Sequence, residues 1–186
     1  IEVKEAEELI EEDIIKAHKK YAEEIIKMYH GEEKIAIAEE RYNKIKNEAD
    51  KKIKEVGTTL ANEQELFHGG KLIDTKENNK LTLSFPLSTT FDPVIANIEA
   101  IHKDKAYDEG ELNISIITNK NSKAKCFPFR HKGTIFGHEK EVLISSEAKL
   151  VVQEKKKISE TTVYKHENGK DLKKLVPVYI TKIDMS

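Results

Sequence analysis

The hydrophobic spacing of the chain changes at Gly57, and this change constrains the fold more than any other feature of the sequence. Before Gly57, apolar residues recur every three or four positions, which is the period of an amphipathic helix. After Gly57, short apolar runs alternate with clusters of Gly, Asn, Pro and Lys, as in a series of strands. The pattern predicts an α+β protein in which helices come first and a β core follows.

Two helices are expected before Gly57, because the helical spacing contains two separate stripes. The first stops near Gly31 and the second at Gly57, and glycine is common just after a helix. Neither stripe lasts more than about three heptads, which favours packing of the helices on each other and on a sheet over a free coiled coil. We therefore expect an N-terminal helical lobe over residues 1–57, built as a helical hairpin. The stripes are Ile10, Ile14, Ala17, Tyr21, Ile25 and Met28, and then Ile35, Ala38, Tyr42, Ile45, Ala49, Ile53 and Val56.

The rest of the chain, residues 58–186, contains eight candidate strands. Alternation of period two is clearest at Leu112, Ile114 and Ile116, as expected of a strand with one buried face. No internal repeat or low-complexity linker divides this part of the chain, so it is expected to form one mostly antiparallel, two-sheet β core. The candidate strands are residues 65–68, 82–88, 111–117, 125–129, 140–144, 149–152, 161–165 and 176–183.

One helix is expected to interrupt these strands, over residues 93–106. Its apolar residues Val94, Ile98 and Ile101 follow the helical period and share one face.

The charge of the chain excludes a broad electrostatic field of one sign. The 186 residues include 32 Lys and Arg against 34 Asp and Glu, so no nucleic-acid partner is expected. Cys126 is the single cysteine and cannot form an internal disulfide, and no apolar run is long enough to cross a bilayer. We expect a soluble protein that acts in a reducing compartment, with no membrane partner and no signal peptide in the acidic stretch after Ile1. The oligomeric state is left open.

Metal and phosphate-loop sites are not expected either. None of the seven histidines has His-Glu-x-x-His spacing, and one cysteine cannot build a structural zinc site. The pair Gly69-Gly70 lacks the further Gly or Lys-Ser/Thr that nucleotide-binding loops need at fixed offsets.

Three short segments stand out by their order along the chain. They are residues 66–70 (Leu-Phe-His-Gly-Gly), 85–93 (Phe-Pro-Leu-Ser-Thr-Thr-Phe-Asp-Pro) and 139–144 (Glu-Lys-Glu-Val-Leu-Ile). Each alone carries little information, because acidic pairs are common in this chain and Ser-Thr-Thr is often a turn or a helix cap. Together they place a polar residue and Gly after an apolar strand, a hydroxyl triplet before a helix, and Glu-x-Glu at the start of a later strand.

In these motifs the predicted β core resembles the arginine–serine–glutamate class of mono-ADP-ribosyltransferases, which includes bacterial exoenzyme toxins, phage enzymes and vertebrate ecto-enzymes. In that class a first strand ends in aromatic-Arg-Gly, a second carries Ser-Thr-Ser, and a fifth begins with Glu-x-Glu. Residues 67–69, 88–90 and 139–141 stand in those places. The chain departs from the pattern at two positions, with His68 in place of the Arg and Thr90 in place of the second Ser.

The resemblance implies an enzyme that transfers ADP-ribose from NAD⁺ to an arginine of a target protein and releases nicotinamide. Cleavage of the nicotinamide–ribose bond builds an oxocarbenium-like centre, which a carboxylate beside the sugar stabilises. Glu141 is expected to be that catalytic carboxylate, and Ser88 to hold it in one rotamer. Glu139 is expected to orient and deprotonate the acceptor, and since it lies two residues earlier on a strand, it should point the same way. Without the other motifs, both glutamates would read as a solvated strand edge.

The resemblance also implies residues that bind the dinucleotide and the target. His68 would contact a phosphate as a cation or a ribose hydroxyl as a neutral ring, as the histidine of the diphtheria-toxin class does, unless it only packs in its strand. Lys103 falls where the class contacts phosphate and nicotinamide, although the position favours a solvated lysine at a helix end. Phe136, in a glycine-containing loop, is expected to touch the target protein or to be buried locally. The expected NAD⁺-binding residues are His68, Gly69, Ser88, Thr89, Lys103 and Glu141.

Two alternatives remain open at this point. One is a protein-binding module that keeps the fold without turnover, and the other is hydrolysis of NAD⁺ with water as the acceptor. Resemblance to toxins also suggests a virulence effector that is secreted or injected and then acts in a cytosol.

Overall fold

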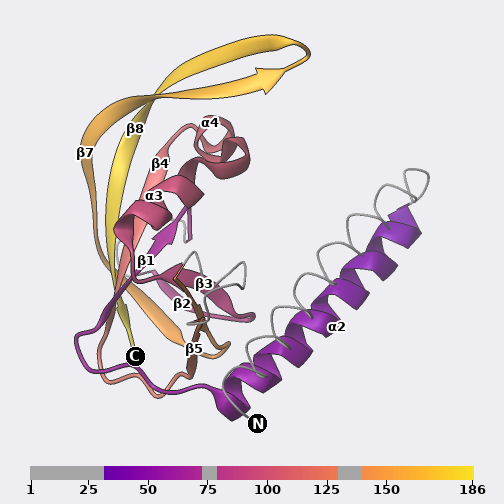
Figure 1. Ribbon diagram of the computed structural model, residues 1–186, viewed down its shortest axis with the longest axis vertical. Helices are drawn as coiled ribbons and strands as arrows, with labels where there is room; N and C mark the ends of the chain where they lie inside the picture. Colours follow the sequence, from indigo (N-terminus) through magenta and orange to yellow (C-terminus); the bar gives the residue numbers. More distant parts are fainter. Residues whose placement is uncertain (1–31, 73–78, 130–139) are drawn as a thin grey trace.

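The computed structural model describes residues 32–72, 79–129 and 140–186. Within these ranges, the long helix α2 (Glu32–Val56) precedes one curled eight-stranded sheet, on which two short helices lie (Figure 1). The first stripe of the predicted hairpin, residues 10–28, lies outside the described residues. Helix α2 confirms the second predicted helix, and it stops directly before Gly57, whose amide donates to the Ile53 carbonyl at 2.8 Å.

The strands follow the order β2-β7-β8-β4-β1-β3-β6-β5 across the sheet. Six of the neighbouring pairs are antiparallel, and β4 pairs with β8 in parallel. The prediction of two sheets is wrong for the described strands, which form a single mixed sheet. The strands are β1 (Glu65–Gly69), β2 (Lys80–Thr82), β3 (Leu87–Thr90), β4 (Leu112–Asn119), β5 (Cys126–Pro128), β6 (Glu141–Ile144), β7 (Lys149–Glu167) and β8 (Lys170–Met185).

One predicted strand is divided in the structure, two others are joined, and the last predicted strand, 176–183, is part of the longer β8. The predicted strand 82–88 is divided between β2 and β3, because Pro86 has no amide hydrogen to continue a ladder. The predicted strands 149–152 and 161–165 are joined in β7, although the charged residues between them resemble a loop. In Figure 1, β7 and β8 extend beyond the other strands as a two-stranded ribbon. Polar residues suit such a ribbon, because much of it faces solvent.

The predicted helix over residues 93–106 is broken. It comprises α3 (Pro93–Ile101), the 3₁₀ turn η1 (His102–Asp104) and α4 (Lys105–Glu109). Lys103 and Asp104 have positive φ angles of 53° and 61°, which an α-helix does not contain. Helix α3 begins with an N-cap, because the Asp92 side chain accepts from the Val94 amide at 3.0 Å.

Helix α3 packs on the sheet through a face other than the one that carries its large apolar residues. Ala96 and Ala100 are buried, whereas the large apolar residues that follow the helical period in the sequence are exposed. The cause lies on β1, where Gly69 has no side chain and lets the backbone of α3 approach closely. Only the alanine face of the helix fits at that distance. The exposed residues are Val94 (63%), Ile98 (57%) and Ile101 (43%).

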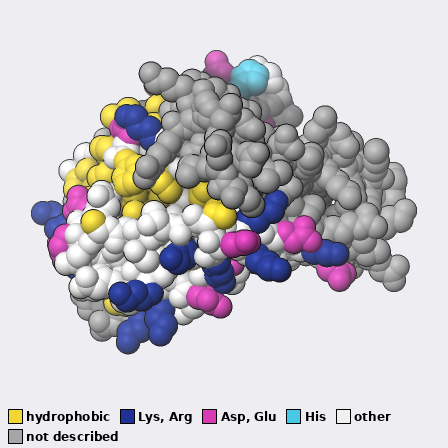
Figure 2. All heavy atoms as spheres, turned by 60° about the horizontal axis from the view of Figure 1, so that its bottom comes forward, with side chains coloured by type: hydrophobic (Ala, Val, Ile, Leu, Met, Phe, Trp, Pro, Cys, Tyr) yellow, Lys and Arg dark blue, Asp and Glu magenta, His cyan; other side chains and the backbone are white. Residues whose placement is uncertain are grey.

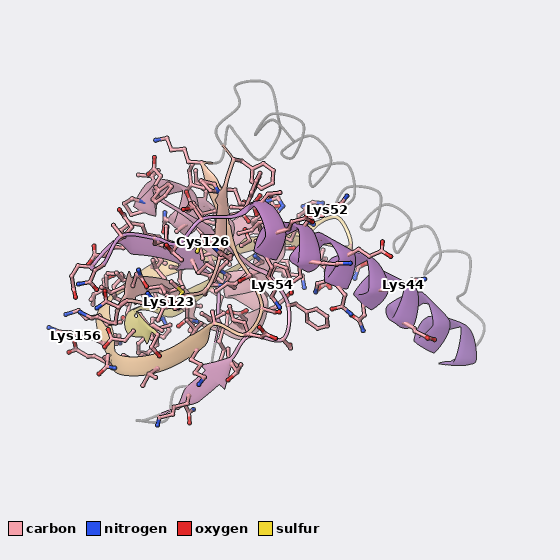
Figure 3. All side chains as sticks on the ribbon, turned by 90° about the horizontal axis from the view of Figure 1, so that it is seen from below. Lys44, Lys52, Lys54, Lys123, Cys126 and Lys156 are labelled. Atoms are coloured by element: carbon pink, nitrogen blue, oxygen red, sulfur yellow. The ribbon has the colours of Figure 1, made fainter. Side chains whose placement is uncertain are left out.

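Three hydrophobic clusters pack on the sheet, and strand β6 contributes to two of them from opposite faces. Because side chains alternate along a strand, Val142 and Ile144 of β6 join the largest cluster, whereas Leu143 between them faces the other way. Leu143 packs with Phe127, Phe129 and Ile53 of α2. Figure 3 shows the result: α2 meets the sheet near Lys54 and extends away from it around Lys44. The largest cluster comprises Leu66, Leu83, Leu87, Ile117, Cys126, Val142, Ile144, Ala148, Leu150, Val152, Ile183 and Met185.

A buried acid joins α2 to the turn after β6. Both oxygens of the Asp50 carboxylate accept from Ser146, one from its amide at 2.7 Å and one from its hydroxyl at 2.6 Å. Lys54, one turn later on α2, lies 3.0 Å from the same carboxylate and donates to the Ser146 hydroxyl at 2.8 Å. The hydrogen bond to Asp50 is the main reason why the pKa of Lys54 is raised. These contacts anchor the helix at the end of a strand that is central to the site below.

Basic and acidic side chains are interspersed on the face of the molecule shown in Figure 2, beside a group of hydrophobic ones. Within the described ranges, no helix combines the length and apolarity that crossing a membrane requires.

Candidate active site

Ser88 and Glu141 lie on neighbouring strands and are joined directly. Strands β3 and β6 pair so that Thr90 is opposite Glu141 and Ser88 is opposite Leu143, which places the side chains at 88 and 141 on one face. The Ser88 hydroxyl donates to Oε1 of Glu141 at 2.5 Å. Glu141 is only 8% exposed, whereas Ser88 is exposed. The pair is therefore a shielded carboxylate whose hydroxyl partner a ligand can reach.

Thr89 belongs to the opposite face of the same strand. Its hydroxyl donates to the Val142 carbonyl at 2.6 Å, and its side chain is 3% exposed. The structure does not bring this hydroxyl to the Ser88–Glu141 face, where it was predicted to help bind the dinucleotide. Thr89 instead joins the two strands that carry the pair.

His68 lies beside this pair, on β1, which is the other neighbour of β3. Its Nδ1 is 2.8 Å from the Ser88 carbonyl oxygen. Since a carbonyl only accepts, Nδ1 carries a proton, and in the neutral ring Nε2 then presents a lone pair. Burial lowers the pKa of His68, and the nearby charge of Lys105 adds to that effect against the opposing influence of the Ser88 bond and Glu99. The ring is therefore neutral at pH 7.

The packing of α3 is sufficient to explain why residue 69 is a glycine. A Cβ at this position would overlap the Ala96 carbonyl oxygen and lie 2.6 Å from the Ala100 nitrogen. The residue after it, Gly70, has a φ of 109° and donates its amide to the Asn113 carbonyl at 2.9 Å. The end of β1 thus depends on two glycines, one for the close approach of α3 and one for the backbone conformation.

The positive charge of Lys105 acts on His68, and sequence reasoning missed this residue. Lys103, the predicted residue, is exposed in the kink between α3 and α4. Lys105 begins α4, and its Cδ is 3.8 Å from where a Cβ on Gly70 would lie. The kink that brings Lys105 to the end of β1 has no local signal, because Lys103 and Asp104 are not glycines.

An ion pair closes the site on the side where β6 begins. Nζ of Lys140 donates to Oδ2 of Asp92 at 2.8 Å, and this hydrogen bond is the main cause of the lowered pKa of Asp92. Lys140 has a φ of 49°, and β6 starts only at Glu141. The extended strand through residues 139–141, from which Glu139 was predicted to point the same way as Glu141, is therefore wrong at Lys140. Glu139 itself, like Phe136, lies outside the described residues.

Other chemistry has little basis in the part of the chain that the structure describes. No three His, Cys, Asp or Glu side chains gather there as metal ligands. Burial raises the pKa of Cys126 to about 12, so this thiol is not a nucleophile at neutral pH.

Comparisons with known proteins give similarity in structure alone. No family model matches the sequence, and no curated protein matches it. Vis toxin, an ADP-ribosyltransferase from Vibrio splendidus, is 13% identical over 98% of this chain and 73% of its own, with a TM-score of 0.45. The ADP-ribosyltransferase HopU1 of Pseudomonas syringae pv. tomato is 10% identical over 78% of this chain and 52% of its own, with a TM-score of 0.43.

A third similar structure is exoenzyme S from Pseudomonas aeruginosa, solved with human 14-3-3 protein beta and carba-NAD. It is 12% identical over 78% of this chain and 58% of its own, with a TM-score of 0.39. The function proposed next rests on the residues of the site.

Proposed function

We propose that this protein is an NAD⁺-dependent mono-ADP-ribosyltransferase that transfers ADP-ribose to an arginine of a target protein. The observation that carries the proposal is the hydrogen bond from the exposed Ser88 hydroxyl to the shielded Glu141 carboxylate. The two residues are far apart in sequence and meet across neighbouring strands, in the arrangement that the motifs imply.

Glu141 suits the cleavage of NAD⁺ because its charge is held in place before the reaction. When the bond between ribose C1′ and the nicotinamide nitrogen breaks, the bonding electrons leave with nicotinamide and positive charge develops on the sugar. A carboxylate shielded from water stabilises that charge more than a solvated one does. Ser88 restricts Glu141 to one rotamer, so little reorganisation is needed. The acceptor nitrogen then bonds to C1′ and loses a proton.

His68 supports binding of the dinucleotide through a neutral contact. A neutral ring cannot replace the permanent charge and five donors of an arginine at a phosphate. Its Nε2 can accept from a ribose hydroxyl, because Nδ1 is already engaged with Ser88. Lys105 is the residue that brings positive charge to this end of β1. Of the alternatives for His68, the ribose contact therefore has the best support.

The acceptor side of the proposal rests on Glu139 and Phe136. Glu139 would orient the guanidinium and take its proton, which is general-base work, and Phe136 would touch the target protein. One solved structure of Vis toxin contains agmatine, a small guanidinium compound, and this makes agmatine a suitable probe of the acceptor.

The helical lobe over residues 1–57 would border the site, and the catalytic core would comprise residues 58–186. Support comes from Ile53 of α2, which packs against Leu143. Leu143 lies two residues after Glu141 and on the same face of β6. Helix α2 is thus attached to the face of the sheet that carries the carboxylate.

The test measures nicotinamide release from NAD⁺ by the purified protein alone, with agmatine, and with a cell lysate. We expect release in all three, acceleration by agmatine, and labelled ADP-ribose on arginine residues of a lysate protein. Release that yields only free ADP-ribose would identify an NAD⁺ hydrolase instead. Absence of nicotinamide release in every arm would identify a binding module without turnover.

A further inference from the structure

We propose that Asp92 and Lys140 form a positioning pair for Glu141, in which their contact fixes the start of β6 against the end of β3. The inference rests on the proposed function, because it concerns how the carboxylate assigned there is held. Both residues lie within the motif segments 85–93 and 139–144, but the resemblance gives neither of them a role.

Asp92 is bonded to three different parts of the site. Its Oδ2 accepts from Lys140 Nζ at 2.8 Å and its Oδ1 from the Val94 amide at 3.0 Å. Its own amide donates to the Thr90 hydroxyl at 3.1 Å. Thr90 is the residue of β3 that lies opposite Glu141. Asp92 therefore connects the end of β3, the start of α3 and the residue before Glu141.

Lys140 is the point at which the pair acts on β6. Its φ of 49° belongs to the left-handed region, which a residue with a side chain adopts only where its surroundings hold it there. The next residue is already in the sheet, because the Glu141 carbonyl accepts from the Phe129 amide at 2.9 Å. A change in the conformation of Lys140 would therefore move the backbone that carries Glu141.

The opposite end of β6 is held separately. Ser146, just beyond the strand, is bonded to Asp50 of α2 through both its amide and its hydroxyl. Loss of the Asp92–Lys140 contact would therefore free only the end of β6 at which Glu141 stands.

The expected effects on turnover and on stability differ in size, and this difference distinguishes a positioning role from a structural one. The side chains of Lys140 and Asp92 are 60% and 26% exposed, and ion pairs this open to solvent contribute little to stability. Catalysis is far more sensitive, because displacement of a reacting group by about 1 Å can cost up to about a hundredfold in rate. The pair should therefore affect turnover much more than unfolding.

The experiment compares Asp92→Asn, Lys140→Gln, Lys140→Arg and the double variant Asp92→Asn/Lys140→Gln. Asparagine is as good an N-cap as aspartate, so Asp92→Asn removes the ion pair and leaves the cap of α3 in place. Lys157→Gln is the control, because Lys157 forms a similarly exposed ion pair with Glu160, at 2.7 Å, on β7. Nicotinamide release gives kcat and KM for NAD⁺, and thermal unfolding is measured in parallel.

We expect Asp92→Asn and Lys140→Gln each to lower kcat by about three- to tenfold, with KM within about twofold of wild type and the same midpoint of unfolding. The double variant should be no slower than the slower single variant, and Lys140→Arg should restore most of kcat. The control should match wild type.

Unchanged kcat in both single variants would overturn the proposal, as would losses that add up in the double variant. A fall in the unfolding midpoint that parallels the fall in kcat would show a structural role instead. Failure of the proposed function looks different, because the wild-type protein itself would then release no nicotinamide, and both proposals would be overturned.

Discussion

The Ser88 hydroxyl donates to the Glu141 carboxylate at 2.5 Å, whereas its neighbour Thr89 donates to the Val142 carbonyl at 2.6 Å on the other face of the sheet. Alternation along β3 thus separates two hydroxyls of similar chemistry. One holds a carboxylate at an exposed site, and the other joins two strands in the interior. Separate replacement of Ser88 and Thr89 therefore measures a catalytic effect and a structural effect at adjacent positions.

Replacement of Glu141 by Gln should lower nicotinamide release by about two to three decades, which corresponds to about 3–4 kcal/mol of transition-state stabilisation. The amide keeps the shape of the side chain and can still accept from Ser88, so the midpoint of thermal unfolding should change little. Glu109→Gln, at an exposed position at the end of α4, is the matched control. Turnover of Glu141→Gln near that of the control would contradict the assignment of the carboxylate.

Ser88→Ala and Thr89→Ala should have opposite effects on turnover and stability. Without the Ser88 hydroxyl, Glu141 is no longer restricted to one rotamer, and we expect kcat to fall about tenfold or more. Without the Thr89 hydroxyl, the buried Val142 carbonyl loses a partner, and the free energy of unfolding should fall by about 1–3 kcal/mol while the folded enzyme keeps its kcat. Steady-state kinetics and denaturant titration of both variants provide the check. Equal effects of the two replacements on kcat would show that Ser88 has no special relation to Glu141.

Much of this site could be predicted from the sequence, because its parts lie at the ends of strands with clear patterns. The alternation in β4 and the apolar run before His68 locate two central strands, and the order of the motifs implies the meeting of Ser88 and Glu141. The end of helix α2 directly before Gly57 could also be predicted, because glycine after a helix is a signal within the local sequence.

The parts that the sequence did not reveal depend on contacts between distant residues. Helix α3 packs through its alanine side because Gly69, on strand β1, admits only that side of the helix. Lys140 is left-handed although lysine has no preference for that conformation, and its partner Asp92 is 48 positions away. Lys105 reaches His68 only through the kink after α3. In each case the two parts that contact each other are too far apart in the chain for a short stretch of sequence to contain both.

His68 should titrate below its ordinary pKa of 6.5, because burial in the folded protein disfavours the charged ring. The sign of the effect on stability follows from this. The unfolded chain takes up the proton first as the pH falls, so the contribution of neutral His68 is complete above pH 6.5 and is lost as the pH drops toward the folded-state pKa.

Three measurements check the protonation state of His68. The ring signals followed by NMR should show a midpoint below 6.5, and the unfolding midpoint of His68→Gln should depend less on pH below 6.5 than that of wild type. KM for NAD⁺ should also stay constant between about pH 6.5 and 8, since a neutral ring makes the same contact throughout. Tighter binding as the pH falls from about 7.5 to 6 would instead indicate a charged ring on a phosphate.

Asp50→Ala should be among the most destabilising single replacements in α2, because it leaves the Ser146 amide and Lys54 without their buried carboxylate. We expect the free energy of unfolding to fall by about 3 kcal/mol. Lys54→Met should cost less, since the Lys54 side chain is 35% exposed and Asp50 keeps both of its bonds to Ser146. Denaturant titration of the two variants gives the comparison. A larger loss from Lys54→Met would mean that the lysine, and not the acid, anchors the helix.

Gly69→Ala should destabilise the protein through α3, because the added methyl group overlaps the Ala96 carbonyl and lies 2.6 Å from the Ala100 nitrogen. Both atoms belong to a helix backbone and cannot turn aside as a side chain could, so α3 must shift as a unit. Overpacking of this kind costs about 1–3 kcal/mol, and the shift would also disturb Asp92, which caps the helix. Gly169→Ala is the control, since its φ of 74° carries a conformational cost of about 1–2 kcal/mol but its surroundings are empty. We expect Gly69→Ala to lower both the free energy of unfolding and kcat, and Gly169→Ala to lower only the former. If Gly69→Ala raised KM for NAD⁺ and left unfolding unchanged, the glycine would serve the dinucleotide directly, as the motif alone suggested, and its role in packing α3 would be wrong.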